Sequence, residues 1–70
     1  MRIIRVEPFL HRQEKRLFLF FNYDKELISI IKQIPTARWS QSRRCWHLAD
    51  NSKNRKRLRF YFWGRALVDY

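Results

Sequence analysis

The side chains best suited to chemistry in this sequence are its cations. Sixteen Lys and Arg residues against six Asp and Glu give a net charge of +10, and a field of this sign makes a polyanion the expected partner. A first basic cluster combines Arg38, Arg43 and Arg44 with Ser40, Gln41 and Ser42. Guanidinium, amide and hydroxyl donors together suit phosphate contacts and readout of base edges. The alternative interpretation is an ordinary solvated hairpin.

A second basic cluster holds five cations within seven residues: Lys53, Arg55, Lys56, Arg57 and Arg59. It follows a capping sequence at residues 50–52, so it lies at the start of a predicted helix, where cations oppose the helix dipole. A phosphate near the helix N-terminus would offset that cost, which favours contact with DNA. The alternative is a solubilising helix face, because charge runs on helices are often no more than that.

Four aromatic residues could lie either in the core or on a binding surface. Phe60 and Trp63 share the polar side of the predicted second helix, which indicates either a docking surface for another domain, the interpretation we favour, or a stacking platform for unpaired bases. Trp39 and Trp46 fall at inward positions of two predicted strands. We expect both in the core rather than in contact with bases.

Few residues suit catalysis or metal binding. Cys45 and His47 lie two apart on one predicted strand, but a nucleophile also needs an orienting group and an oxyanion site, which the sequence does not indicate. Two such side chains are too few for a structural metal site, and Gly64, the single glycine, cannot form a glycine-rich phosphate loop. We therefore expect a non-enzymatic domain with no cofactor, no metal and no small-molecule substrate.

The cysteine count and the apolar pattern bear on location. A single cysteine gives no disulfide framework and fits a reducing compartment. No run of residues approaches the roughly 18 apolar residues of a membrane span. We expect a soluble protein of the cytoplasm, associated with the nucleoid through DNA and without a membrane partner.

A helix is predicted between Asp24 and Pro35. Apolar residues recur there on a 3.6-residue period, namely Leu27, Ile30, Ile31 and Ile34. Asp24 suits the N-cap, because its carboxylate can accept from the free amides of the first turn. Pro35 ends the helix, since the residue before a proline is displaced from the α region.

A β-hairpin is predicted to follow that helix and to carry the first basic cluster. Residues 37–40 form its first strand, and Gln41 and Ser42 its tight turn. In the second strand, Arg44, Trp46 and Leu48 are expected on one side and Arg43, Cys45 and His47 on the other. The helix isoleucines would then pack against Trp39 and Trp46.

Two further strands are predicted before the helix. Residues 2–10 alternate between apolar and polar positions, and Pro8 places this strand at a sheet edge. A turn is expected over residues 11–15. The continuous apolar run at 17–21 is typical of a central strand covered on both faces.

The chain is predicted to close with a helix and a short strand. The second helix runs to about Phe62, with Leu58, Tyr61 and Phe62 on its core side and Gly64 as its C′ residue. Residues 66–70 form a strand that joins the sheet. The expected fold is a single α+β domain, with an antiparallel sheet in β-β-α-β-β-α-β order and helices packed on one face.

The sequence resembles the N-terminal domain of tyrosine-type site-specific recombinases (integrases) from Bacteroidetes and their mobile elements. The resemblance spans nearly the whole chain and rests on Phe21-x-Tyr23-Asp24-Lys25-Glu26-Leu27-Ile28, Ile34-Pro35-x-Ala37-Arg38-Trp39, Cys45-Trp46-His47 and Val68-Asp69-Tyr70. Thr36 departs from it, because a glycine is usual there. A more distant similarity is to the HARP domain of annealing helicases.

This resemblance implies an arm-type DNA-binding module that precedes a core-binding domain and a catalytic domain of a longer recombinase, which would be its protein partners. Tyr70 is not expected to be the recombinase nucleophile. The leading hypothesis is a non-catalytic module that holds duplex DNA through the hairpin and the basic helix. One alternative is a HARP-like binder of single-strand/duplex junctions that stacks bases on Phe60 and Trp63. Another is a protein-interaction domain that docks recombinase domains or subunits, with its charge aiding solubility.

Overall fold

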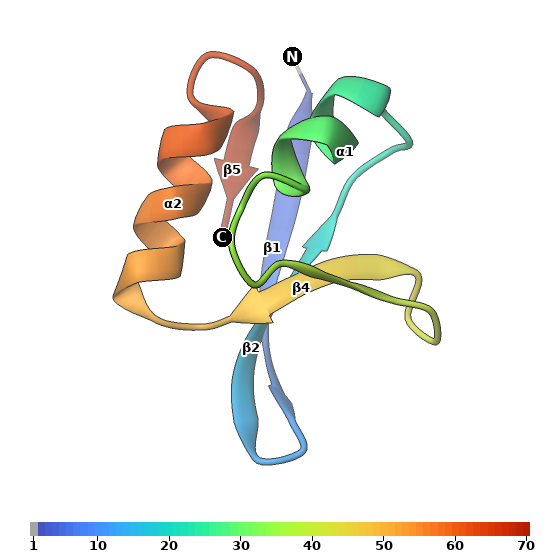
Figure 1. Ribbon diagram of the computed structural model, residues 1–70, viewed down its shortest axis with the longest axis vertical. Helices are drawn as coiled ribbons and strands as arrows, with labels where there is room; N and C mark the ends of the chain where they lie inside the picture. The colour runs from blue at the N-terminus through green and yellow to red at the C-terminus, as the bar shows by residue number, and fades with distance from the viewer. Residues whose placement is uncertain (1) are drawn as a thin grey trace.

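The computed structural model describes residues 2–70, and its elements follow the predicted order (Figure 1). They are β1 (Ile3–His11), β2 (Glu14–Phe20), α1 (Lys25–Ile31), β3 (Arg38–Ser40), β4 (Cys45–Ala49), α2 (Ser52–Phe62) and β5 (Leu67–Asp69). The strands form one sheet in the order β3-β4-β2-β1-β5. The predicted α+β class is confirmed. No helix within residues 2–70 has the length and apolar character needed to cross a membrane.

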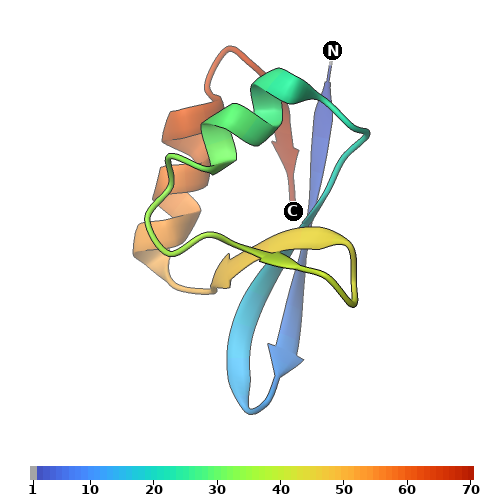
Figure 2. The same ribbon diagram turned by 45° about the vertical axis from the view of Figure 1, so that its right-hand side comes forward.

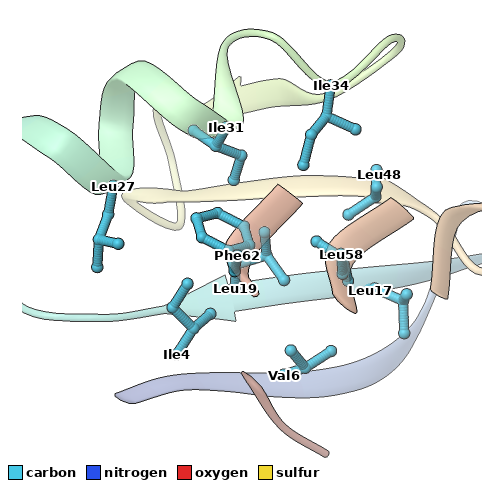
Figure 3. Close-up of a cluster of buried hydrophobic side chains, with 10 residues drawn as sticks. All are labelled: Ile4, Val6, Leu17, Leu19, Leu27, Ile31, Ile34, Leu48, Leu58 and Phe62. Carbon is cyan, nitrogen blue, oxygen red and sulfur yellow. The ribbon is translucent and has the colours of Figure 1, made fainter. Parts of the chain in front are cut away.

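The core lies between the two helices and one face of the sheet. Ten buried side chains form it, from every element except β3 and β5 and from the turn after α1, as Figure 3 shows: Ile4, Val6, Leu17, Leu19, Leu27, Ile31, Ile34, Leu48, Leu58 and Phe62. The core side predicted for the second helix is confirmed. The alternation predicted for the first strand holds for Ile4 and Val6, whereas Leu10 at its far end is 68% exposed. Leu17, Phe18 and Leu19 are all buried, so β2 is covered on both faces as its apolar run indicates.

The sheet is mixed rather than wholly antiparallel. β5 pairs with β1 in parallel, from Ile3 opposite Leu67 to Arg5 opposite Asp69, while the other three pairings are antiparallel. Only a short turn separates α2 from β5, so β5 runs back along α2 and in the same direction as β1 (Figure 1). Gly64 makes that turn possible with φ of +74°, the left-handed conformation expected of a C′ glycine.

The edge position predicted for β1 holds only for its second half. β5 covers residues 3–5 of β1, and Pro8 lies beyond the end of that pairing. The missing amide of Pro8 therefore costs no hydrogen bond to β5.

The turn between β1 and β2 is shorter than the predicted residues 11–15. β1 extends to His11 and β2 begins at Glu14, so only Arg12 and Gln13 connect them. Both residues have positive φ, 52° and 66°, which is the type I′ geometry that matches the twist of a two-residue hairpin. The sequence does not predict this turn, because it lacks the glycine or asparagine that usually marks a type I′ turn.

Helix α1 begins where predicted and ends three residues early. Asp24 accepts hydrogen bonds from the amides of Glu26 and Leu27 at 2.9 and 3.1 Å, which confirms the cap. After Ile31 the bonds change to the shorter 3₁₀ pattern, with the amide of Ile34 donating to the carbonyl of Ile31 at 3.1 Å. This tighter turn keeps Ile34 in the core.

Trp39 does not lie in the core, so its predicted placement is wrong. Its side chain is 48% exposed, because β3 lies at an edge of the sheet and has a neighbouring strand on one side only. Trp46 is half-buried and packs against the core cluster. The two rings meet edge to face, with centroids 5.6 Å apart.

Candidate nucleic-acid interface

An open cavity of about 610 Å³ lies between the β1–β2 hairpin, the start of β3 and the first half of α2. Five cationic side chains line it: Arg12, Arg16, Arg38, Lys53 and Arg57. Of the carboxylates in the described chain, only Glu14 contributes to the lining. We call this feature the basic cavity. It draws together cations that are up to 45 positions apart in the sequence.

The N-terminus of α2 holds one wall of the basic cavity in place. Asn51 caps the helix by accepting from the amide of Asn54 at 2.8 Å. The side chain of Asn54 is almost fully buried and donates to the carbonyl of Ala49 at 2.8 Å, while its oxygen accepts from Arg57 Nη1 at 3.0 Å. Arg57 is therefore oriented by a buried amide that sequence inspection missed.

A histidine orients the opposite wall. Arg16 Nε and Nη2 lie 3.2 and 2.9 Å from His47 Nδ1. Arginine has only donors, so Nδ1 must accept and the imidazole proton must be on Nε2. Burial lowers the pKa of His47, and the nearby charges of Arg16, His11 and Arg38 lower it further. His47 is therefore neutral near pH 7 and holds Arg16 as an acceptor.

This contact predicts a pH dependence of stability. The unfolded chain protonates His47 with an ordinary pKa near 6.5, whereas the pKa in the folded state lies lower. The unfolded state therefore binds more protons below about pH 6.5, and the free energy of unfolding falls as the pH drops from there towards the folded pKa. Urea denaturation at pH 7.5 and at lower pH values measures this.

The matched variant is His47→Gln, whose amide oxygen can accept from Arg16 without titrating. Its stability should depend less on pH than that of the unmodified protein, since the carboxylates titrate equally in both. An equal pH dependence in the two proteins would show that His47 plays no part.

The arginines of the first basic cluster have three different surroundings. Arg38 lines the basic cavity. The guanidinium carbon of Arg43 lies 4.6 Å from the ring centroid of Phe9 and 5.2 Å from that of Phe18, on the sheet face opposite the helices. Arg44 lines a separate apolar pocket near Trp39. These residues are close in the sequence, but the sequence alone does not show the direction of each side chain.

Arg43 and Arg44 belong to the turn and not to the second strand, so the predicted extent of that strand is wrong. Their predicted sides are nevertheless correct, because Arg43 lies on the sheet face of His47 and Arg44 lines a pocket with Trp46. β4 begins at Cys45, and the amide of Arg44 closes the turn on the carbonyl of Ser40 at 2.7 Å. Arg44 takes φ of 54°. The connection therefore spans four residues, 41–44, instead of the predicted two. Figure 2 shows this hairpin and the β1–β2 hairpin projecting in different directions.

The polar residues of the hairpin tip bond to one another. The indole N–H of Trp39 donates to Gln41 Oε1 at 3.1 Å, and the hydroxyls of Ser40 and Ser42 lie 3.4 Å apart. Ser40 also accepts from the amide of Arg43 at 3.2 Å. These contacts fix the turn and occupy groups that were candidates for contacts with base edges.

The residues of the second basic cluster also lie in different surroundings. Lys53 and Arg57 line the basic cavity. Arg55 pairs with Asp50 at 2.8 Å, and its hydrogen bond lowers the pKa of that carboxyl. Lys56 and Arg59 turn the other way. They border a shallow depression of about 540 Å³ together with Phe60 and Trp63.

The predicted exposure of Phe60 and Trp63 is confirmed, at 78% and 84%. Cys45, by contrast, is buried, and burial raises the pKa of its thiol. A buried thiol of high pKa is a poor nucleophile. The Cys45 and His47 pair therefore has a structural explanation, because His47 is engaged with Arg16.

Sequence inspection did not identify Arg12 and Arg16 as site residues. They lie with Lys15 at the predicted turn between the first two strands, and the strand pairings bring them to the site. Arg16 lies opposite Ala49 of β4, and Phe18 lies opposite His47. The available signal was the alternation of β2, which places Arg16 on the same face as Phe18.

No protein-family model matches this sequence, and the searches of curated proteins and of solved structures find no significant match either. The resemblance to recombinase N-terminal domains therefore stays a prediction.

Proposed function

We propose that this domain binds duplex DNA without catalysing a reaction and that the basic cavity receives the phosphates. The observation that carries the proposal is the convergence of five cations from both hairpins and α2 on one open cavity with a single carboxylate in its lining. Phosphate contacts of this kind supply most of the sequence-independent affinity for DNA.

The cavity is also preorganised for such a ligand. Asn54 holds Arg57, and His47 holds Arg16, before any phosphate arrives. Side chains that are already ordered lose less conformational entropy on binding. The overall charge of +10 adds long-range attraction that raises the rate of encounter with a polyanion.

The second hairpin and α2 remain the binding elements of this proposal, but the residues assigned to DNA contact differ from those predicted from the sequence. Arg38 represents the second hairpin, Lys53 and Arg57 represent the helix, and Arg12 and Arg16 add the first hairpin. The resemblance supports a place in a tyrosine recombinase of mobile elements, acting on DNA in the bacterial cytoplasm. Core-binding and catalytic domains would then be its neighbours.

The exposed pair Phe60 and Trp63 supports a second candidate function. Two large aromatic side chains at 78% and 84% exposure form an apolar area on α2, and areas of this kind commonly serve as contacts with proteins or unpaired bases. The alternatives are therefore a domain-docking surface and a platform for the junction between single-stranded and duplex DNA.

Gel-shift titrations with duplex, forked and single-stranded DNA of equal length separate these functions. The proposal expects tight binding to duplex at low salt, and equal duplex binding by a Phe60→Ser, Trp63→Ser double variant. A preference for forked DNA that this variant loses would support the junction platform. Failure to bind any of the three DNAs would contradict DNA binding and favour protein docking.

A further inference from the structure

A second concavity, of about 230 Å³, lies between α1, the end of β2 and the β3–β4 hairpin. Its walls include Phe21, Tyr23, Ile28, Trp39, Arg44 and Trp46. We call it the aromatic pocket, and we propose that it takes one unpaired base of a nucleic-acid strand. The inference rests on the proposed function, because it assumes that the domain meets nucleic acid.

The walls of the aromatic pocket offer planar rings that the core does not use. Tyr23 is 78% exposed and Trp39 is 48% exposed, yet both line a concave surface. The hydrogen bond to Gln41 and the edge of Trp46 hold the Trp39 ring in place. A fixed, accessible indole is a suitable surface for a base, because every base has a π-face that can stack on it.

The charge at the pocket identifies the class of ligand. Arg44 contributes a guanidinium to the lining, and no carboxylate within residues 2–70 forms an ion pair with it. A cation there disfavours the ammonium ligands that aromatic cages otherwise bind. It favours a ligand that joins a planar ring to an anionic group, as a nucleotide joins its neutral base to a charged phosphate.

The size of the pocket agrees with a single base. Pockets for drug-sized ligands measure roughly 300 to 1,000 Å³, and this one is smaller. A base inside duplex DNA is stacked and paired, so entry requires an unpaired or extruded nucleotide. The ligand is therefore a single-stranded stretch, or a frayed end next to a duplex.

The basic cavity and the aromatic pocket lie on opposite sides of β3, which is an edge strand of the sheet. Arg38 lines the basic cavity and its neighbour Trp39 lines the aromatic pocket, because successive strand residues point to opposite faces. A strand whose phosphates occupy the basic cavity can reach the aromatic pocket by passing around β3. The geometry thus links backbone contacts on one face with a base on the other.

Tryptophan fluorescence reports on the aromatic pocket directly. The chain has three tryptophans, so a Trp63→Phe protein retains only Trp39 and Trp46, both in the pocket lining. We expect a single strand of about twelve thymidines to quench their emission. A strand of the same length and charge with abasic sites in place of the bases should bind more weakly and leave the emission unchanged.

Substitution separates the pocket from the basic cavity. Trp39→Ala should lower the affinity for the thymidine strand about tenfold and change the affinity for duplex DNA less than twofold. Arg44→Asn should lower the affinity for the thymidine strand severalfold, since asparagine tolerates the left-handed backbone of that position. Its matched control, Arg12→Asn, removes a charge from the same backbone conformation in the other hairpin, and it should weaken duplex binding while keeping the quench at saturation.

Equal binding and equal quenching by the abasic strand would overturn the aromatic pocket as a base site. A Trp39→Ala protein that keeps full affinity for the thymidine strand would overturn it as well. In both cases duplex binding would persist, so the proposed function would stand. Absence of binding to any nucleic acid at low salt would overturn the proposed function, and this inference with it.

Discussion

Replacing Phe62 with alanine is expected to lower the free energy of unfolding by about 3 to 5 kcal/mol. Phe62 is fully buried at the centre of the cluster that joins α2 to the sheet and α1 (Figure 3). Alanine would leave a cavity among side chains from several elements that cannot all move inward. A domain of this length has a total stability of roughly 4 to 10 kcal/mol, so most of it would be lost. Urea denaturation followed by circular dichroism measures the change.

Trp63→Ala is the matched control for that prediction. Trp63 is the next residue in the chain and is 84% exposed, and surface substitutions of this kind usually change stability by less than about 0.5 kcal/mol. A cooperative transition of the Phe62→Ala protein near that of the Trp63→Ala protein would show that the cluster in Figure 3 does not carry the fold.

The parts of the fold that the sequence predicted are those with a local physical cause. Asp24 caps α1 because a short carboxylate reaches the first-turn amides, and Gly64 follows α2 because it adopts positive φ without strain. Ile4 and Val6 are buried because alternation on a strand needs no knowledge of its neighbours. Each of these features depends on fewer than ten consecutive residues.

The features that the sequence did not predict depend on which strands are neighbours. Trp39 has the pattern of an inward residue, but β3 is an edge strand and leaves its side chain 48% exposed. The parallel pairing of β5 with β1 follows from the short turn after α2, which returns the chain along that helix in the direction of β1. Neither fact can be read from periodicity, which reports the faces of an element and not its place in the sheet.

The candidate site illustrates the same limit. Clustering in the sequence correctly drew attention to Arg38, Lys53 and Arg57, which line the basic cavity. It also grouped Arg43 and Arg44 with Arg38, although neither of them lines that cavity. Arg16 was missed because its neighbour in space is His47, 31 positions away.

The affinity of the domain for duplex DNA is expected to fall steeply with salt concentration. If the basic cavity neutralises about four to five phosphates, the logarithm of the binding constant falls against the logarithm of salt concentration with a slope of roughly −4. A fourfold rise in salt then weakens binding roughly 150-fold to 500-fold. Fluorescence anisotropy with a labelled duplex at several salt concentrations measures the slope.

Two double variants of equal charge decide whether the cavity or the overall charge is responsible. Arg38→Gln with Arg57→Gln removes two cations from the cavity, and the slope should become shallower by about two units, because each lost phosphate contact contributes about 0.9. Lys25→Gln with Lys32→Gln removes two exposed cations at the ends of α1, outside the cavity, and should leave the slope nearly unchanged. Equal flattening by both pairs would mean that the DNA responds to the net charge of +10 and not to a site. Because the pairs carry the same total charge, only a localised contact can make them differ.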